Sequence, residues 1–187
     1  LMYLDDSTIR SLELIYPLRG NDISKTLYGV LDQAQTAMGK RLLRNWILHP
    51  LIRKDLIEKR YYCVEQFFKN EQLANETGEL LTNISDLERI LIRLSGKSAN
   101  ARDLQFLANS VGASLKILDL KGIAEVVKSL DNNIPTNIRS SLNSELVEYI
   151  SKAIKDDPAL TITQGDMIRE GFDKDLDEIR QTADSGK

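Results

Sequence analysis

The chain has 187 residues, a formal net charge of −3 and a sequence pI of about 5.3. A domain that grips nucleic acid over its whole surface is usually basic, so this balance leaves only a local or indirect role at DNA. The single cysteine, Cys63, excludes an intrachain disulfide framework and a multi-cysteine metal site, and only 10 Gly and 4 Pro interrupt the chain, which favours long helices.

The chain shows no targeting signal, which predicts a cytoplasmic protein without a membrane partner. No apolar run approaches the roughly 20 residues that a membrane-spanning helix needs, and no signal-peptide pattern opens the sequence. The apolar residues 1–4 and a helical pattern that continues almost to residue 187 predict that further sequence flanks the chain on both sides.

Hydrophobic periodicity predicts four helices in the first part of the chain. Residues 5–14 form a short one, and Ser24 is expected to cap a second that ends near residue 31. A third runs over residues 38–49 and ends at Pro50, with an inward face that comprises Met38, Leu42, Leu43, Trp46 and Ile47. Asp55 is expected to cap a longer helix whose inward residues are Tyr61, Val64, Phe67 and Phe68.

Further helices and one change of period follow. Residues 85–88, Ser-Asp-Leu-Glu, match a capping box in which Ser85 caps a helix that ends at Gly96. Residues 100–118 are the clearest amphipathic run, and Pro135 begins a helix that stops before Pro158. Alternation in residues 160–172, with a turn at 165–166, predicts a small β-hairpin, and a last helix begins at Asp173. The fold class expected is all-α: an irregular multi-helix domain with one small β-hairpin near its C-terminal end.

No catalytic, cofactor-binding or metal-binding residue is expected. Residues 96–98 read Gly-Lys-Ser, but Leu91 stands where a phosphate-binding loop needs its first glycine. His49 is the only histidine, and beside the last carbonyls of a helix it favours a structural role over a ligand or general base. Asp173 and Asp175 fall at a helix start, where capping explains them better than acid–base chemistry.

Charge is distributed unevenly along the chain. Residues 38–60 carry seven basic and two acidic side chains, whereas residues 145–187 carry six basic and eleven acidic ones. The basic stretch makes Arg44, Arg53 and Lys54 candidate contacts to the DNA backbone. The competing interpretation is a solvated face that pairs with acidic parts of the same protein, which is the commoner behaviour of charge runs.

Several segments in order resemble one family. Residues 4–14, LDDSTIRSLEL, match the L-D-x-x-T-x-x-x-L-E-L pattern that opens the core (lever) domain of MutS-type DNA mismatch repair proteins, with Ser11 where many relatives have Asn. The other matching segments follow in the family's order and span almost the whole chain: residues 26–32, 36–51, 86–94, 101–104 and 168–180.

The resemblance implies that residues 1–187 are a fragment of this core domain, with the mismatch-recognition, clamp and ATPase domains missing. It implies no enzyme activity in the segment but a structural and allosteric transmitter between the DNA-binding and ATPase ends of a homodimer. ATP and Mg would then lie in the missing ATPase domain, and DNA would be reached through the parent protein. Expected partners are the other domains of its own chain and a downstream mismatch repair protein, in a bacterial cytoplasm at the nucleoid.

Three alternatives remain open at this stage. One is a free-standing helical adaptor that binds proteins, and another is the same domain from a MutS relative used for recombination. A small helical hydrolase is the third, but it needs a His/Asp metal cluster that a single histidine does not supply.

The matched segments also predict structural roles. Gly39 is expected to let a neighbouring backbone approach, and Trp46 to be a core residue whose loss costs about 3–5 kcal/mol. Arg41 and Arg89 are expected to tie helices together by pairing with Glu13, Asp32 or Glu88, since arginine is seldom buried without an acidic partner. The full set of predicted structural residues is Met38, Gly39, Arg41, Trp46, Pro50, Asp86, Glu88 and Arg89.

Overall fold

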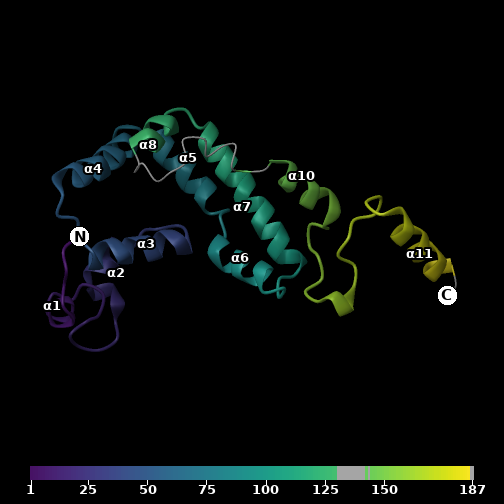
Figure 1. The fold of residues 1–187 in the computed structure, drawn as a ribbon, viewed down its shortest axis with the longest axis horizontal. Coiled ribbons are helices and arrows are strands. Elements are labelled where there is room, and N and C mark those ends of the chain that lie inside the picture. Colours follow the sequence, from purple (N-terminus) through teal and green to yellow (C-terminus); the bar gives the residue numbers. More distant parts are fainter. Residues whose placement is uncertain (130–141, 143, 186–187) are drawn as a thin grey trace.

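The computed structural model describes residues 1–129, 142 and 144–185, and Figure 1 shows them as an elongated arch of helices. One end holds α1 (Asp6–Ser11), the 3₁₀-helix η1 (Ile23–Lys25), α2 (Leu27–Leu31) and α3 (Ala37–Leu48). The middle holds α4 (Lys54–Lys69), α5 (Glu71–Leu81), α6 (Leu87–Ser95), α7 (Ala101–Asp119) and α8 (Ile123–Ser129). The remaining elements are α10 (Ser144–Ala153), the 3₁₀-helix η2 (Ile162–Gln164) and α11 (Lys174–Ser185). The prediction of an all-α fold is confirmed.

Helix α7 is the spine of the described chain, and its start was predicted correctly. The Asn100 side chain accepts from the Asp103 backbone N–H at 3.0 Å, and the Asp103 carboxylate accepts from the Asn100 N–H at 3.1 Å, so the two residues form a reciprocal capping box. At 1.5 Å per residue the 19 residues of α7 span roughly 28 Å. In Figure 1 it runs diagonally between α5 and α10 and reaches both halves of the arch.

Three predicted caps lie at neighbouring residues instead. Asp86, not Ser85, caps α6, because its carboxylate accepts from the Arg89 N–H while the Ser85 N–H is donated to Ser110. Thr26, not Ser24, caps α2 by accepting from the Gly29 N–H. The N-cap position of α4 is Arg53, and Asp55 lies inside the first turn. Several adjacent polar residues compete for such a position, and the local sequence does not decide which one wins.

The predicted β-hairpin is wrong, although its turn exists. Gly165 and Asp166 both have positive φ, at 68° and 56°, as a tight turn requires. Within the described residues, however, 160–172 form no strand pair of their own, and Ile168 makes a single antiparallel bridge to Ile154 at the end of α10. Of the helix predicted from Pro135, residues 135–141 and 143 lie outside the described chain, and the part that is described contains α10.

Two small apolar clusters flank α7. On one side Ala101 and Ala108 of α7 let α10 approach closely, and Ile150, Ala153 and Ile154 fill the contact. On the other side Leu73 of α5 meets Ile123 and Val126 of α8. These residues are all at most 7% exposed, so the stable packing of the described chain is centred on α7.

The apolar faces of α3 and α4 are not buried as predicted. In α3, Leu42 is 50% and Trp46 38% exposed, and the other three predicted inward residues are half-buried. In α4, Tyr61, Val64 and Phe68 are 63–88% exposed. The apolar residues 1–4 are also exposed in part, with Tyr3 at 89%. Phe67 does pack against the cluster of Leu73, Ile123 and Val126, as predicted. The helical periodicity was right, but the described chain leaves the other side chains largely exposed, so the core-residue cost expected for Trp46 does not apply.

Glycine is required at position 29 by a close backbone approach. A Cβ atom there would lie 2.0 Å from the carbonyl oxygen of Ile23 and 2.8 Å from the Cα of Ser24. Gly39, for which this role was predicted, faces side-chain atoms instead, with Thr36 Oγ1 at 3.0 Å from its ideal Cβ. The contact at Gly29 holds η1 against α2.

We expect Ile90→Ala to destabilise the chain by about 2–5 kcal/mol, because the side chain is 2% exposed and its removal leaves a cavity. Ile92→Ala on the same helix is the matched control. Ile92 is 71% exposed, so its loss should change stability by less than about 0.5 kcal/mol. Urea unfolding followed by circular dichroism measures both, and equal effects would contradict the packing of α6.

We expect Gly29→Ala to destabilise the fold, because the new methyl group cannot coexist with the Ile23 carbonyl without moving η1 away from α2. Gly78→Ala in α5 is the control, because a Cβ there meets nothing within 4 Å. Alanine in an open helical position should raise stability by up to about 1 kcal/mol. Thermal unfolding should therefore shift in opposite directions in the two variants, and a shift in the same direction would refute the close approach.

Candidate functional site

The polar contacts that join α3, α6 and α7 are the candidate functional site. The Arg41 guanidinium of α3 donates to both oxygens of Asp86, at 2.8 and 2.9 Å, and to Glu88 Oε2 at 2.5 Å. Both acids lie at the amino end of α6, where negative charge is favoured by the helix dipole. We refer to this three-residue contact as the Arg41 fork. It spans 45 residues of sequence and joins elements that are distant in the chain.

Electrostatics in the fork follow from its hydrogen bonds. Donation to Asp86 first, and to Glu88, raises the pKa of Arg41, and the same contact holds the pKa of Asp86 below its ordinary value. Solvent still reaches the pair, since the Arg41 side chain is 47% and that of Glu88 66% exposed. The predicted pairing of Arg41 with Glu88 is confirmed, while Asp86, its bidentate partner, was not among the acids considered.

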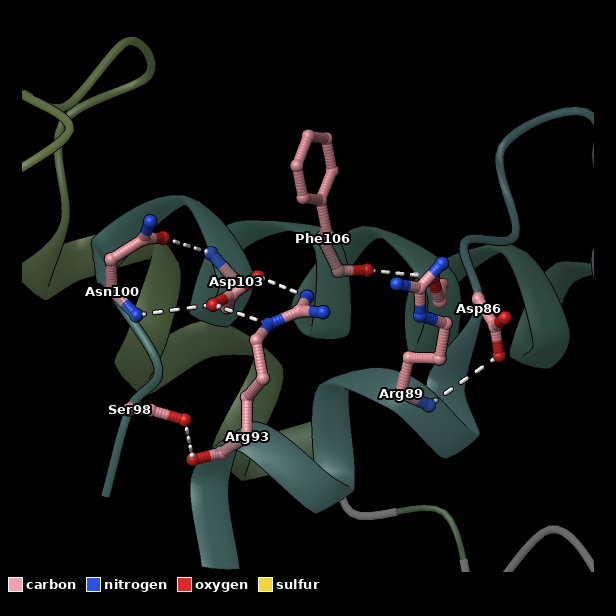
Figure 2. A network of polar contacts seen from close by, with 8 residues as sticks. Asp86, Arg89, Arg93, Ser98, Asn100, Asp103 and Phe106 are labelled. Atoms are coloured by element: carbon pink, nitrogen blue, oxygen red, sulfur yellow. Dashed lines mark hydrogen bonds and ion pairs between the residues drawn. The ribbon is translucent and has the colours of Figure 1, made fainter. Parts of the chain in front are cut away.

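Arg89 does not form the tie predicted for it. It is exposed, and no carboxylate of the described chain lies within ion-pair distance of it. Its positive charge still helps to lower the pKa of Asp86. Figure 2 shows its side chain between Asp86 and Phe106, and with Arg93 these residues line a shallow cavity of about 320 Å³. The other two acids considered for this tie have different partners: Glu13 accepts from the Leu18 N–H, and Asp32 lies 3.7 Å from Lys40 of α3.

A second network joins α6 to α7, and the sequence analysis missed it (Figure 2). The Arg93 guanidinium donates through Nε to Asp103 Oδ2 at 3.0 Å and through Nη2 to Oδ1. Asp103 is 6% exposed and also completes the capping box with Asn100, so its carboxylate is fully used. Hydrogen bonding from Arg93 is the main cause that lowers the pKa of Asp103. Arg93 and Asp103 are ten residues apart and lie on two successive helices. A search for ion pairs at i, i+4 within one helix therefore does not find them.

Of the other predicted structural residues, Trp46 and Pro50 lie near the turn between α3 and α4, and Met38 lies at the far end of α3. The Arg60 guanidinium lies 3.7 Å from the Trp46 ring centroid, a close cation–π contact, and burial lowers the pKa of Arg60. Pro50 follows the end of α3, and its carbonyl accepts from the Met2 N–H at 2.7 Å. Met38 is half-buried in the first turn of α3.

Each candidate DNA-backbone residue has a partner within the chain. Arg44 donates to the Tyr16 hydroxyl at 3.2 Å, Arg53 pairs with Asp55 at 2.6 Å, and Lys54 lies 3.5 Å from Glu58. A phosphate contact would have to compete with these local bonds, so the role at DNA stays a prediction.

The geometry adds no sign of metal or phosphate chemistry. The described residues contain no group of three or more His, Cys, Asp or Glu side chains placed to hold a metal ion. Residues 96–98 lie at the carboxyl end of α6, where the helix dipole repels phosphate. His49 Nδ1 lies 3.1 Å from the Asn45 carbonyl, which matches the structural role predicted for it. Within the same described part of the chain, no helix is long and apolar enough to cross a membrane.

We expect Asp103→Asn to lower stability at neutral pH by about 1–3 kcal/mol, because Arg93 loses its charged partner. The folded pKa of Asp103 lies below its unfolded value near 3.8, so its contribution is complete above that value and is lost as the pH falls through the lower folded pKa. The variant should therefore show a smaller loss of stability on acidification than the original chain. Urea midpoints measured from about pH 7 to about pH 2 test this.

Asp157→Asn is the control for this series. Asp157 pairs with Arg102 at 2.8 Å, but its side chain is 88% exposed, so we expect almost no change. Equal effects of the two substitutions would show that burial of Asp103 contributes nothing.

Comparison with known proteins gives a consistent answer over the whole chain. The sequence model of the family described as MutS domain III matches residues 7–184. The DNA mismatch repair protein MutS of Clostridium perfringens is 39% identical over 188 aligned residues, which cover 100% of this chain and 20% of that protein. The proteins of the same name from Halothermothrix orenii and Thermus thermophilus are each 38% identical, over 100% and 98% of this chain and 20% and 21% of their own lengths.

The chain thus spans about a fifth of the length of these relatives. The match begins before the end of α1 and continues into α11, so it includes the Arg41 fork and the Arg93–Asp103 pair. We conclude that the chain belongs to the MutS family and corresponds to its domain III.

Proposed function

We propose that this chain is the transmitter segment of a DNA mismatch repair ATPase, linking the end that binds mismatched DNA to the end that hydrolyses ATP. The observation that carries the proposal is the match of this chain to MutS domain III. About four-fifths of the length of each relative lies outside the matched segment. The proposal assigns no active site to residues 1–187. It assigns ATP and Mg to an ATPase domain, and mismatch recognition to a separate domain, both outside this segment.

Transmission requires stiff elements joined by contacts with defined geometry. Helix α7 supplies a rigid length of roughly 28 Å, and bidentate arginine contacts connect it through α6 to α3. Such forks fix direction as well as distance, because both guanidinium nitrogens must face both carboxylate oxygens. A displacement at one end of the arch is thereby passed on as a movement of whole helices.

The exposed apolar faces support a position inside a larger assembly. Val64 and Phe68 of α4 and Leu42 of α3 present large side chains to solvent along two neighbouring helices. Large apolar side chains exposed on a helix face favour an interaction site. We propose that other domains of the same protein cover it, in a homodimer that reaches DNA through its other domains and recruits a downstream mismatch repair protein, in the bacterial cytoplasm at the nucleoid.

Two alternatives predict different behaviour. A free-standing helical adaptor would work without an ATPase domain, and its binding partner would occupy the α3–α4 surface. The domain of a recombination-type MutS relative would have the same fold, but its full protein would show no preference for mismatched duplexes.

A domain exchange tests the proposal. Residues 1–187 replace the matching segment of Clostridium perfringens MutS, and ATP hydrolysis is measured with matched and mismatched duplexes. We expect the hybrid to bind DNA, to hydrolyse ATP and to change its hydrolysis rate when the duplex carries a mismatch. A hybrid that keeps both activities but loses the mismatch response would contradict the transmitter role.

The isolated chain is the second arm of this test. We expect it to bind neither duplex at physiological salt and not to hydrolyse ATP. A preference for the mismatch would place recognition within these 187 residues and overturn the proposal. Equal binding to both duplexes that disappears as salt rises would instead assign Arg44, Arg53 and Lys54 to backbone contact.

A further inference from the structure

The described chain divides at residues 51–53. The amino-terminal lobe, residues 1–50, holds α1, η1, α2 and α3, and the helical body holds α4 onward. The closely packed helix pairs fall on one side or the other: α2 packs on η1 and α3, whereas α4, α5, α6, α8 and α10 pack on α7 or on one another. Residues 51–53 between them are non-helical, and Arg53 is extended at φ −74° and ψ 121°.

The contacts across this division are chiefly charged. The Arg41 fork joins α3 to the amino end of α6, and the Arg60 guanidinium lies over the Trp46 ring. Both are directional contacts between partly exposed side chains, and neither is an interlocked apolar core. The lobe has little other attachment, because its buried apolar residues, Leu14 and Ile15, lie inside the lobe itself.

A cavity of about 300 Å³ lies at the same junction. Trp46 lines it from the lobe, Leu51 from the connection, Cys63 and Val64 from α4, and Ser129 from the end of α8. An open, mostly apolar space of this size means that dispersion contacts between lobe and body are incomplete there. The cavity therefore leaves room for small changes of angle on this side.

We propose that the amino-terminal lobe rotates on the helical body about residues 51–53, and that the Arg41 fork is the latch that holds the arrangement seen here. The inference concerns the geometry of this chain and stands whether or not the segment transmits signals between DNA and ATP. The Arg41 side chain is 47% and that of Glu88 66% exposed, although Asp86 is 18% exposed. An ion pair that solvent reaches in this way holds a geometry without stabilising it strongly, and salt screens it. Opening the latch thus releases the lobe without unfolding either part.

A distance measurement between the two parts tests the latch. Spin labels are attached at Ser7→Cys in α1 and Asn109→Cys in α7, both exposed, in a chain that carries Cys63→Ala. Pulsed electron paramagnetic resonance then reports the distribution of lobe–body distances. We expect one narrow distribution for the original fork and a broad one, with a new population, for Arg41→Gln.

Arg44→Gln is the matched control, because Arg44 lies on the same helix but bonds to Tyr16 within the lobe. It should keep the narrow distribution. Raising NaCl from about 0.05 M to about 1 M, where the Debye length falls to about 3 Å, should broaden the original distribution and leave that of Arg41→Gln unchanged. Far-UV circular dichroism verifies helix content, and the salt series on the original fork decides the matter if Arg41→Gln loses helix. An unchanged distribution in Arg41→Gln or in high salt, or equal broadening in Arg44→Gln, would overturn the latch.

Discussion

The pairing of Arg93 with the buried carboxylate of Asp103 is the contact on which the rest of the arrangement depends. A carboxylate that is 6% exposed must be satisfied, and here the guanidinium and the Asn100 N–H together use both oxygens. Because Asp103 also closes the capping box of α7, the same side chain sets where α7 begins and how α6 lies against it. With α6 held in that direction, its amino end presents Asp86 and Glu88 to α3.

Helix α6 thereby lies between two arginine contacts of different strength. Towards α7 it contributes Arg93 to a nearly buried acid, and towards α3 it contributes two acids to a half-exposed arginine. Water and salt weaken the second contact more than the first, since screening acts mainly on exposed charges and both of its partners are the more exposed. The carboxyl end of α6 is consequently held more strongly, to α7, and its amino end is held more weakly, to the amino-terminal lobe. This difference in strength follows from burial, because both contacts pair an arginine with carboxylates.

How far the fold could be predicted follows from which interactions are local. The start of α7 at Asn100 and the end of α3 before Pro50 were predictable, because capping and proline sterics act over a few residues. The Arg93–Asp103 pair was not, because its geometry exists only after α6 and α7 have packed. In the same way the turn at Gly165 was found, but its segment pairs with Ile154 and not with itself, since pairing partners are a tertiary property.

The exposed faces of α3 and α4 show a second limit of prediction from the sequence, which concerns helices whose pattern was predicted correctly. Periodicity located an apolar stripe on each helix correctly, yet Trp46 and Phe68 remain open to solvent among the described residues. A stripe shows only that one face of the helix is apolar, and it carries no information on whether the covering element lies in the same 187 residues. The exposure of these faces has a physical explanation, because the chain corresponds to one domain of much longer relatives. Where chiefly charged contacts join the lobe to the body, apolar contacts to neighbouring domains can pull on the lobe without first breaking a core. A segment built this way is rigid along α7 and flexible at residues 51–53. Force applied to its exposed faces therefore changes the angle between lobe and body before it deforms the helices.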